Sequence, residues 1–105
     1  MTNNDIIPII LLNWNGWNDT VDCLSSLYNS RYKNFCVVVA DNGSTDDSIP
    51  NIIQWLQEAR KEYHILEKNE KIKNLKSGCC YLIQFDTNHG FAKGNNLVIE
   101  SLVET

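Results

Sequence analysis

Three polar stretches carry the side chains best suited to bind a ligand. They are 13–19 (NWNGWND), 41–47 (DNGSTDD) and 86–96 (DTNHGFAKGNN), and each follows an apolar run. Carboxylates accept hydrogen bonds, amides both donate and accept them, and glycines allow a backbone to approach a ligand closely. If the chain brings these stretches together, they can form one binding site for a polar small molecule.

The stretch 41–47 shows how one turn can serve two purposes. Asp41 ends an apolar run with a carboxylate that can accept an N–H from a ligand. Gly43 permits a left-handed or close-approach backbone, and Ser44 or Thr45 is expected to cap the helix that follows. The alternative is that 41–47 is only a turn with capping residues, and the turn taken alone leaves both interpretations open.

The apolar runs before these stretches predict strands. Residues 5–14 are mainly aliphatic, as in a strand that is buried on both faces. Residues 35–40 are rich in β-branched side chains and predict a second buried strand, and 79–85 predict a third.

Helical periodicity follows each strand. Apolar residues recur at helical spacing in 21–28 and again in 49–56. The second of these helices is expected to begin near 46–48 and to run to about Glu62, and a third helix is expected over 91–103. The alternation of strands and helices predicts an α/β fold, a Rossmann-like three-layer α/β/α arrangement with a mainly parallel sheet.

Such a sheet would place all three polar stretches at one edge. In open α/β sheets, ligands bind outside the carboxyl ends of the strands, and each stretch lies at such an end. We therefore expect the three to meet along one crevice. The chain of 105 residues is expected to form a single domain, with 64–78 as a lysine-rich, solvated excursion from it.

Composition narrows the class of partner. The formal net charge of −4 gives no positive field to attract nucleic acid or an anionic membrane. No apolar run approaches the roughly 18 residues of a membrane span, so no membrane segment is predicted and the expected address is the cytoplasm.

The cysteines and histidines offer no recognisable metal motif. The four cysteines have no metal-finger spacing and are expected to be reduced core residues: Cys23, Cys36, Cys79 and Cys80. His89 lies in a candidate binding loop, where a lone histidine is more often solvated, and His64 has still less to suggest a function.

Taken together, the stretches 9–27, 37–48 and 88–96 resemble the N-terminal part of family 2 glycosyltransferases of the GT-A fold, and within them the rhamnosyltransferase-like members. The string in 88–96 is the most specific, and the resemblance covers nearly the whole chain apart from the lysine-rich segment. The positions that match the nucleotide-binding stretches of similar enzymes are Leu12, Asn13, Trp14, Asn15, Asp41, Asn42, Gly43, Ser44, Asn88, Gly90, Gly94 and Asn96.

The resemblance implies a role for two of these positions. Trp14 falls where an aromatic side chain often flanks the nucleotide base, and the residue matching Asp41 typically accepts the ring N–H of uracil or thymine. It also implies transfer of a hexose or deoxyhexose from a UDP- or dTDP-linked sugar to a glycan acceptor, as in polysaccharide or cell-surface glycan synthesis.

Similar enzymes hold a divalent cation, Mg²⁺ or Mn²⁺, on an Asp-x-Asp motif that this sequence lacks. The pair Asp46 and Asp47 lies in the wrong loop, and Asp86 precedes the Gly-Asn-Asn string instead of following it. No catalytic residue is assigned, and the chain is expected to be a nucleotide-binding half with little activity alone. Sheet surface left uncovered is expected to favour self-association. The alternative function is a non-catalytic α/β module for binding or assembly.

Overall fold

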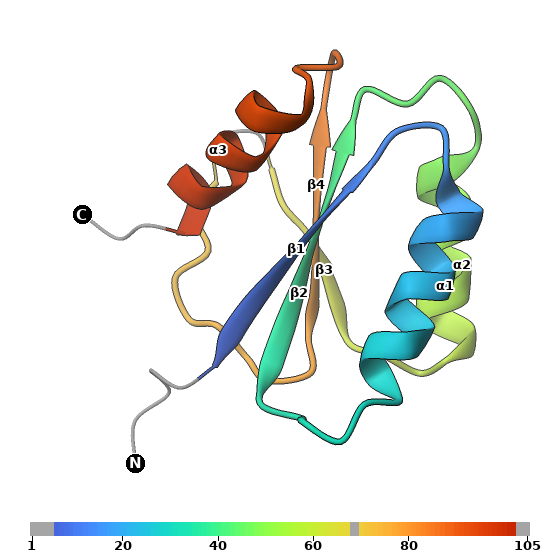
Figure 1. The fold of residues 1–105 in the computed structure, drawn as a ribbon, viewed down its shortest axis with the longest axis vertical. Coiled ribbons are helices and arrows are strands. Elements are labelled where there is room, and N and C mark those ends of the chain that lie inside the picture. Colours follow the sequence, from blue (N-terminus) through green and yellow to red (C-terminus); the bar gives the residue numbers. More distant parts are fainter. Residues whose placement is uncertain (1–5, 68–69, 103–105) are drawn as a thin grey trace.

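The computed structural model describes residues 6–67 and 70–102, which form a sheet with helices on both faces (Figure 1). In chain order the elements are β1 (Ile7–Asn13), α1 (Trp17–Tyr28), β2 (Phe35–Asn42), α2 (Ser48–Glu58), β3 (Tyr63–Ile65), β4 (Cys80–Phe85) and α3 (Phe91–Leu102).

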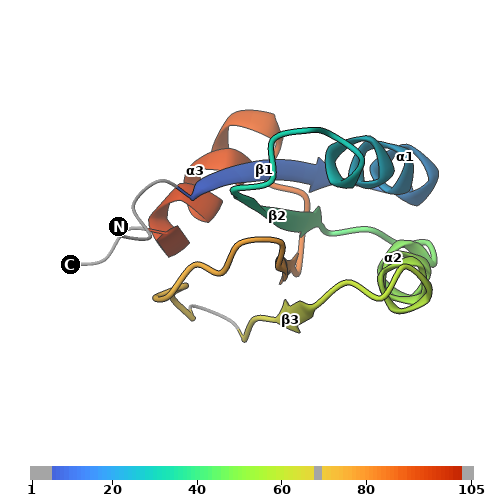
Figure 2. The ribbon, with the colours of Figure 1, turned by 90° about the horizontal axis from the view of Figure 1, so that it is seen from below.

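The sheet is parallel throughout, with the strand order β1-β2-β4-β3. Helices α1 and α2 cover one face and α3 covers the other, as the view from below shows (Figure 2). This arrangement confirms the predicted Rossmann-like α/β architecture. The register places Asn13 beside Asp41, so the ends of β1 and β2 lie level with each other.

The core lies on both sides of β2, whose residues are all buried. Val37 and Val39 pack toward α1 and α2, whereas Val38 and Ala40 pack on the opposite side, toward α3. A strand covered on both faces needs apolar side chains at nearly every position, which explains the continuous run in the sequence.

The expectation that 5–14 would be buried on both faces holds only in part for β1, whose side chains pack against both cores without being fully covered. Its side chains from Pro8 to Leu12 are only partly buried, and Asn13 is the one buried residue of the strand. The reason is position, because β1 forms an edge of the sheet and neighbours only β2 among the described residues.

The second helix ends at Glu58, earlier than the predicted Glu62. Arg60 takes a left-handed conformation with φ of 57°. Its N–H donates to the carbonyl of Gln57, and the N–H of Lys61 donates to that of Leu56. This is the Schellman pattern, which normally uses glycine at the left-handed position, and an arginine there gives the sequence no stop signal.

The described residues of the segment 64–78, which are 64–67 and 70–78, are less solvated than predicted. The first two residues of the segment belong to β3, a short strand at the edge of the sheet. Ile72 is only 4% exposed and lies in the core on the side of the sheet that α3 covers. The N–H of Ile72 also donates to the carbonyl of Ser101 at 2.9 Å, which ties the segment to α3. The cysteine prediction needs one correction as well, since all four thiols are free but Cys23 is exposed.

Candidate functional site

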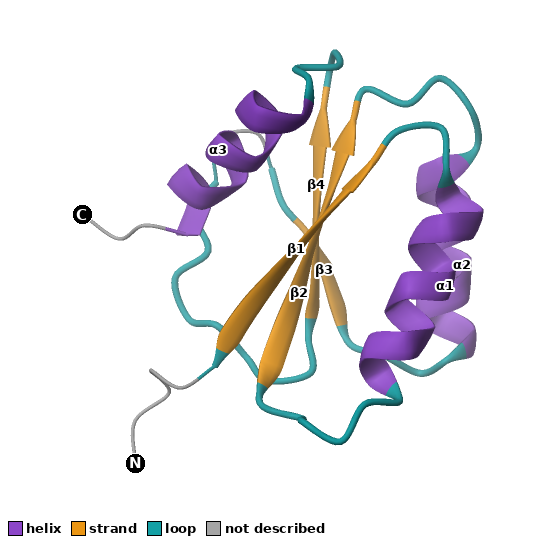
Figure 3. Ribbon diagram, in the orientation of Figure 1, coloured by secondary structure: helices purple, strands orange, loops and turns teal. Residues whose placement is uncertain are grey.

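The loops after β1, β2 and β4 leave the sheet at the same edge, at the carboxyl ends of the parallel strands (Figure 3). They contain the three polar stretches identified in the sequence. Hydrogen bonds join these loops to one another, as the prediction of a common site requires. We call the loops after β1, β2 and β4 the joined loops.

Asp41 lies at the centre of the first set of contacts and is fully buried. One of its carboxylate oxygens, Oδ1, accepts from Asn13 Nδ2 at 2.9 Å and from the Ser44 hydroxyl at 2.6 Å. The other, Oδ2, accepts the backbone N–H of Ser44 at 3.0 Å. Asn13 is itself held by the Thr20 hydroxyl, which donates to its Oδ1 at 2.6 Å. The carboxylate therefore fixes the turn after β2 against β1 and α1.

Asn15 makes the second connection between the same two loops. Its Oδ1 accepts the backbone N–H groups of Thr45 at 2.8 Å and Asp46 at 3.2 Å. Its own N–H donates to the Ser44 hydroxyl at 2.9 Å. The side chain reaches this position because Asn15 adopts a left-handed backbone, with φ of 49°, which asparagine tolerates better than most residues.

These contacts correct the prediction that Ser44 or Thr45 caps α2. The residue at the N-cap is Asp47, and the N–H of Ser48 is bound instead by Asp46 Oδ1 at 2.9 Å. The Ser44 hydroxyl already donates to Asp41 and accepts from the first loop, so it does not cap the helix.

Asn42 joins the third loop to the second. Its Oδ1 accepts the backbone N–H of His89 at 2.8 Å, and its Nδ2 donates to the carbonyl of Gly90 at 3.2 Å. Gly43 sits directly against this loop with φ of 78°, and a Cβ there would lie 2.5 Å from the carbonyl carbon of Thr87. Only glycine fits such a contact between two backbones.

Gly94 brings α3 close to the ends of β1 and β2. A Cβ at this position would lie 3.3 Å from Asn42 Nδ2 and 3.3 Å from Leu12 Cδ1. The structure thus places Leu12, Asn42 and Gly94 in one contact, although Leu12 is only partly buried.

The predicted residues that remain available to a ligand lie on the outer surface of the joined loops. Trp14 is 55% exposed, and Asn88 and Asn96 are exposed. Asn88 also stabilises its own loop, because its Oδ1 accepts the N–H of Gly90 at 2.7 Å.

A cavity of about 580 Å³ lies beside the joined loops, between the residues that follow β3, the end of β4 and α3. Its lining includes Leu66, Phe85, His89, Lys93, Leu97 and Glu100. The predicted site residues do not line it. Sequence analysis missed the cavity because it forms where residues 66–67 and 70–71 approach α3, and no local pattern signals that approach.

The resemblance implies a divalent cation only for an enzyme that has an Asp-x-Asp motif, and the loops of this chain do not fit such an ion. In the described part of the chain, no group of three metal-ligating side chains lies at this edge of the sheet. Asp46 uses one oxygen on the N–H of Ser48, and neighbouring Asp47 is exposed. We therefore derive no step of a reaction through a metal here.

No helix within residues 6–67 and 70–102 has the length and apolar character needed to span a membrane.

Comparison with known proteins identifies the family. Searches of curated proteins and of solved structures found no match. The model of the family described as glycosyl transferase family 2 matches residues 9–101, which include the joined loops, α1, α2 and all but the last residue of α3. The chain therefore belongs to glycosyl transferase family 2.

Proposed function

We propose that the joined loops bind the nucleotide of a UDP- or dTDP-linked sugar, and that this chain is the nucleotide-binding half of a glycosyltransferase. The observation that carries the proposal is the set of hydrogen bonds that unites the three loops, in which Asn13 donates to Asp41 while Asn15 and Asn42 accept backbone N–H groups. In open α/β sheets this edge is where nucleotides bind, and membership of the family implies a nucleotide-sugar donor.

Trp14 and Asp41 have different roles in this proposal. Trp14 offers an exposed aromatic face on which a pyrimidine ring can stack. Asp41 Oδ2 accepts one hydrogen bond from the Ser44 backbone, and a carboxylate oxygen has two acceptor sites. A ring N–H can therefore bind Oδ2 without displacing Ser44, provided that the loop opens enough to expose the buried carboxylate.

The transferred group and its acceptor follow from the resemblance of 88–96 to rhamnosyltransferase-like enzymes. We propose a hexose or deoxyhexose donor and a glycan acceptor, in polysaccharide or cell-surface glycan synthesis. The loops supply neither a carboxylate cluster for a cation nor an assigned general base. The chain by itself is accordingly expected to bind nucleotide without transferring sugar.

The test is a titration of the chain with UDP, dTDP and ADP, followed by amide NMR shifts. We expect shifts at Trp14 and in 41–47 with UDP and dTDP, and much smaller shifts with ADP. Trp14→Ala should remove most of the pyrimidine-dependent shifts without unfolding the chain, because Trp14 is exposed.

Asp41→Ala removes the acceptor, and Asp47→Ala is its control at an exposed position of the same loop; unchanged amide shifts outside 41–47 must first show that Asp41→Ala stays folded. Pyrimidine shifts that survive in Asp41→Ala would remove the base-recognition role. If the folded parent chain shows no pyrimidine-selective shift at all, the alternative of a non-catalytic binding or assembly module is favoured.

A further inference from the structure

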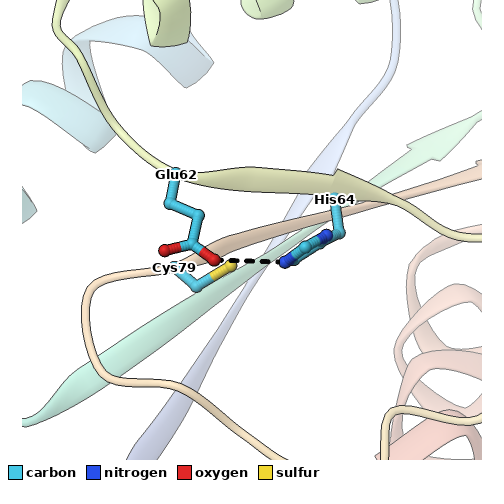
Figure 4. A group of neighbouring side chains, drawn as sticks. All are labelled: Glu62, His64 and Cys79. Atoms are coloured by element: carbon cyan, nitrogen blue, oxygen red, sulfur yellow. Dashed lines mark hydrogen bonds and ion pairs between the residues drawn. The ribbon is translucent and has the colours of Figure 1, made fainter.

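Three side chains with metal-binding atoms converge at the other end of the sheet from the joined loops (Figure 4). They are Glu62, His64 and Cys79, and their carboxylate oxygen, imidazole nitrogen and sulfur atoms all lie within 4.8 Å of one another. Glu62 and His64 are exposed, and Cys79 is buried beneath them.

Strand pairing brings these residues together. Glu62 immediately precedes β3 and His64 lies within it, so their side chains project from the same side of the strand. Cys79 immediately precedes β4, and the N–H of Cys80 donates to the carbonyl of Glu62 at 2.9 Å. This backbone bond holds the amino ends of the two strands side by side.

The geometry points to a Zn²⁺ site formed by Glu62, His64 and Cys79, with a fourth position open to water. Carboxylate oxygen, imidazole nitrogen and thiolate sulfur are the ligands that zinc takes in proteins, and three protein ligands with one open position form a familiar tetrahedral arrangement. No motif spacing signals this site, because its ligands come from two strands that meet only in the sheet.

The distances support this assignment. Glu62 Oε2 and His64 Nε2 lie 3.3 Å apart. Two ligand atoms at the usual distances from a tetrahedral zinc ion lie about 3.3 Å from each other. The imidazole is also oriented by Tyr81, whose ring stacks on that of His64 with a centroid distance of 5.9 Å. The sulfur, which lies within 4.8 Å of both other ligand atoms, needs to approach them by no more than about 1.2 Å, and the exposed partners can accommodate this.

Lys76 is the group that opposes metal binding. Its Nζ lies 2.8 Å from Glu62 Oε1, whereas Oε2 is the oxygen that faces His64. The ion pair therefore leaves the ligating oxygen free of the ammonium group. Exposed ion pairs of this kind contribute little to stability, so Lys76 can also move away. On binding, Cys79 gives up its thiol proton to solvent and coordinates as the thiolate.

The experiment is a Zn²⁺ titration of the chelator-stripped chain against a chromophoric chelator, with Co²⁺ as a spectroscopic probe. We expect one equivalent to bind, and Co²⁺ to give a thiolate charge-transfer band. His64→Gln and Glu62→Gln change exposed side chains, so they should leave the fold intact and weaken Zn²⁺ binding by at least about tenfold.

Matched controls separate this site from nonspecific binding by thiols and imidazoles. Cys23→Ser and His89→Gln change the same residue types away from the cluster and should bind Zn²⁺ like the parent chain. Cys79→Ser should lose the charge-transfer band. Parent-like affinity in His64→Gln and Glu62→Gln, or loss of binding in Cys23→Ser, would overturn the assignment.

Lys76→Gln provides an independent check with the opposite sign. Removing the ammonium group should tighten Zn²⁺ binding, because the carboxylate no longer has a competing cation. Weaker binding in this variant would contradict Glu62 as a ligand. Zn²⁺ should also slow amide exchange in β3, since the ion would link that strand to the start of β4.

Discussion

Asn15 shows how much of the site depends on one side chain. It accepts two backbone N–H groups from the next loop while holding a left-handed backbone. These hydrogen bonds are exposed, so water can replace a lost acceptor, and each bond contributes at most the usual net value of about 0.5–1.5 kcal/mol. The contacts between the first two loops therefore concentrate at this residue and at Ser44.

We predict that Asn15→Ala lowers the free energy of unfolding by about 1–3 kcal/mol, from lost hydrogen bonds and left-handed strain. Urea unfolding would measure the change. Asn18→Ala, on the exposed face of α1, is the matched control and should change stability by less than about 0.5 kcal/mol. Equal effects of the two substitutions would contradict the role of Asn15.

Gly43 supports a second prediction at the residue scale, with Gly78 as the control. Both have positive φ, but a Cβ on Gly43 would meet the Thr87 backbone at 2.5 Å, whereas a Cβ on Gly78 meets nothing within 4 Å. Both alanine variants should pay about 1–2 kcal/mol of backbone strain, and Gly43→Ala should lose more because the loops must separate. Equal losses of stability in the two variants would show that the second and third loops can separate without lowering the free energy of unfolding.

At the scale of elements, the end of α2 is set by hydrogen bonding and not by sequence preference. Arg60 occupies a left-handed position that glycine would take without steric strain. The short strand β3 starts three residues later, so the exact end of the helix determines where Glu62 and His64 lie.

Arg60→Gly is expected to raise the free energy of unfolding by about 0.5–1 kcal/mol, because relief of left-handed strain exceeds the entropy cost of glycine. Gln57→Gly, within the same helix, should instead lower it by about 1 kcal/mol. Thermal unfolding of both variants would measure the contrast. A loss of stability in Arg60→Gly would mean that the arginine side chain contributes more than its backbone costs.

At the scale of the whole molecule, the buried thiols make stability depend on pH. Burial raises the pKa of Cys36 to about 11 and that of Cys80 to about 12. A pKa that is higher in the folded state means that the unfolded chain loses its thiol protons first. Stability is therefore fully present below the ordinary thiol pKa of 9.0 and falls as pH rises from there toward 12.

The measurement is urea unfolding between pH 8 and about pH 11, where the unfolded thiols ionise. We expect the free energy of unfolding to fall across this range, and to fall less steeply in Cys36→Ala. A tyrosine also contributes above its ordinary pKa of 10.0, because burial raises the pKa of Tyr81 to about 12. An unchanged slope in Cys36→Ala would contradict the contribution of that thiol.

Self-association through uncovered sheet surface stays a prediction. The edge strands each expose an aliphatic side chain, with Ile7 51% and Ile65 55% exposed. Sedimentation velocity over a range of concentrations would test it, with Ile7→Lys as a variant that should weaken association at the β1 edge.

The sequence predicted those parts of the fold that follow from local patterns. The continuous apolar run of β2 and the periodicity of α1 and α3 are visible in the residues themselves. The short strand β3 was missed because three residues give no period, and Ile72 was assigned to solvent because its neighbours are charged. The candidate residues of the joined loops were named, but their bonds to one another, the adjacent cavity and the Cys79 cluster arise only when distant segments pack together.

The strand order also has a consequence for how the chain assembles. Each pair of neighbouring strands in residues 6–67 and 70–102 is parallel, so these strands form no hairpin and each pairing waits for a connection that crosses the sheet. The unit β1-α1-β2 is contiguous and can form as soon as it leaves the ribosome, whereas β3 finds its partner only when β4, which follows it in the chain, has paired with β2. We therefore expect folding to be slow for a chain of this size, with the two loops joined by Asn15 in place before the third loop arrives.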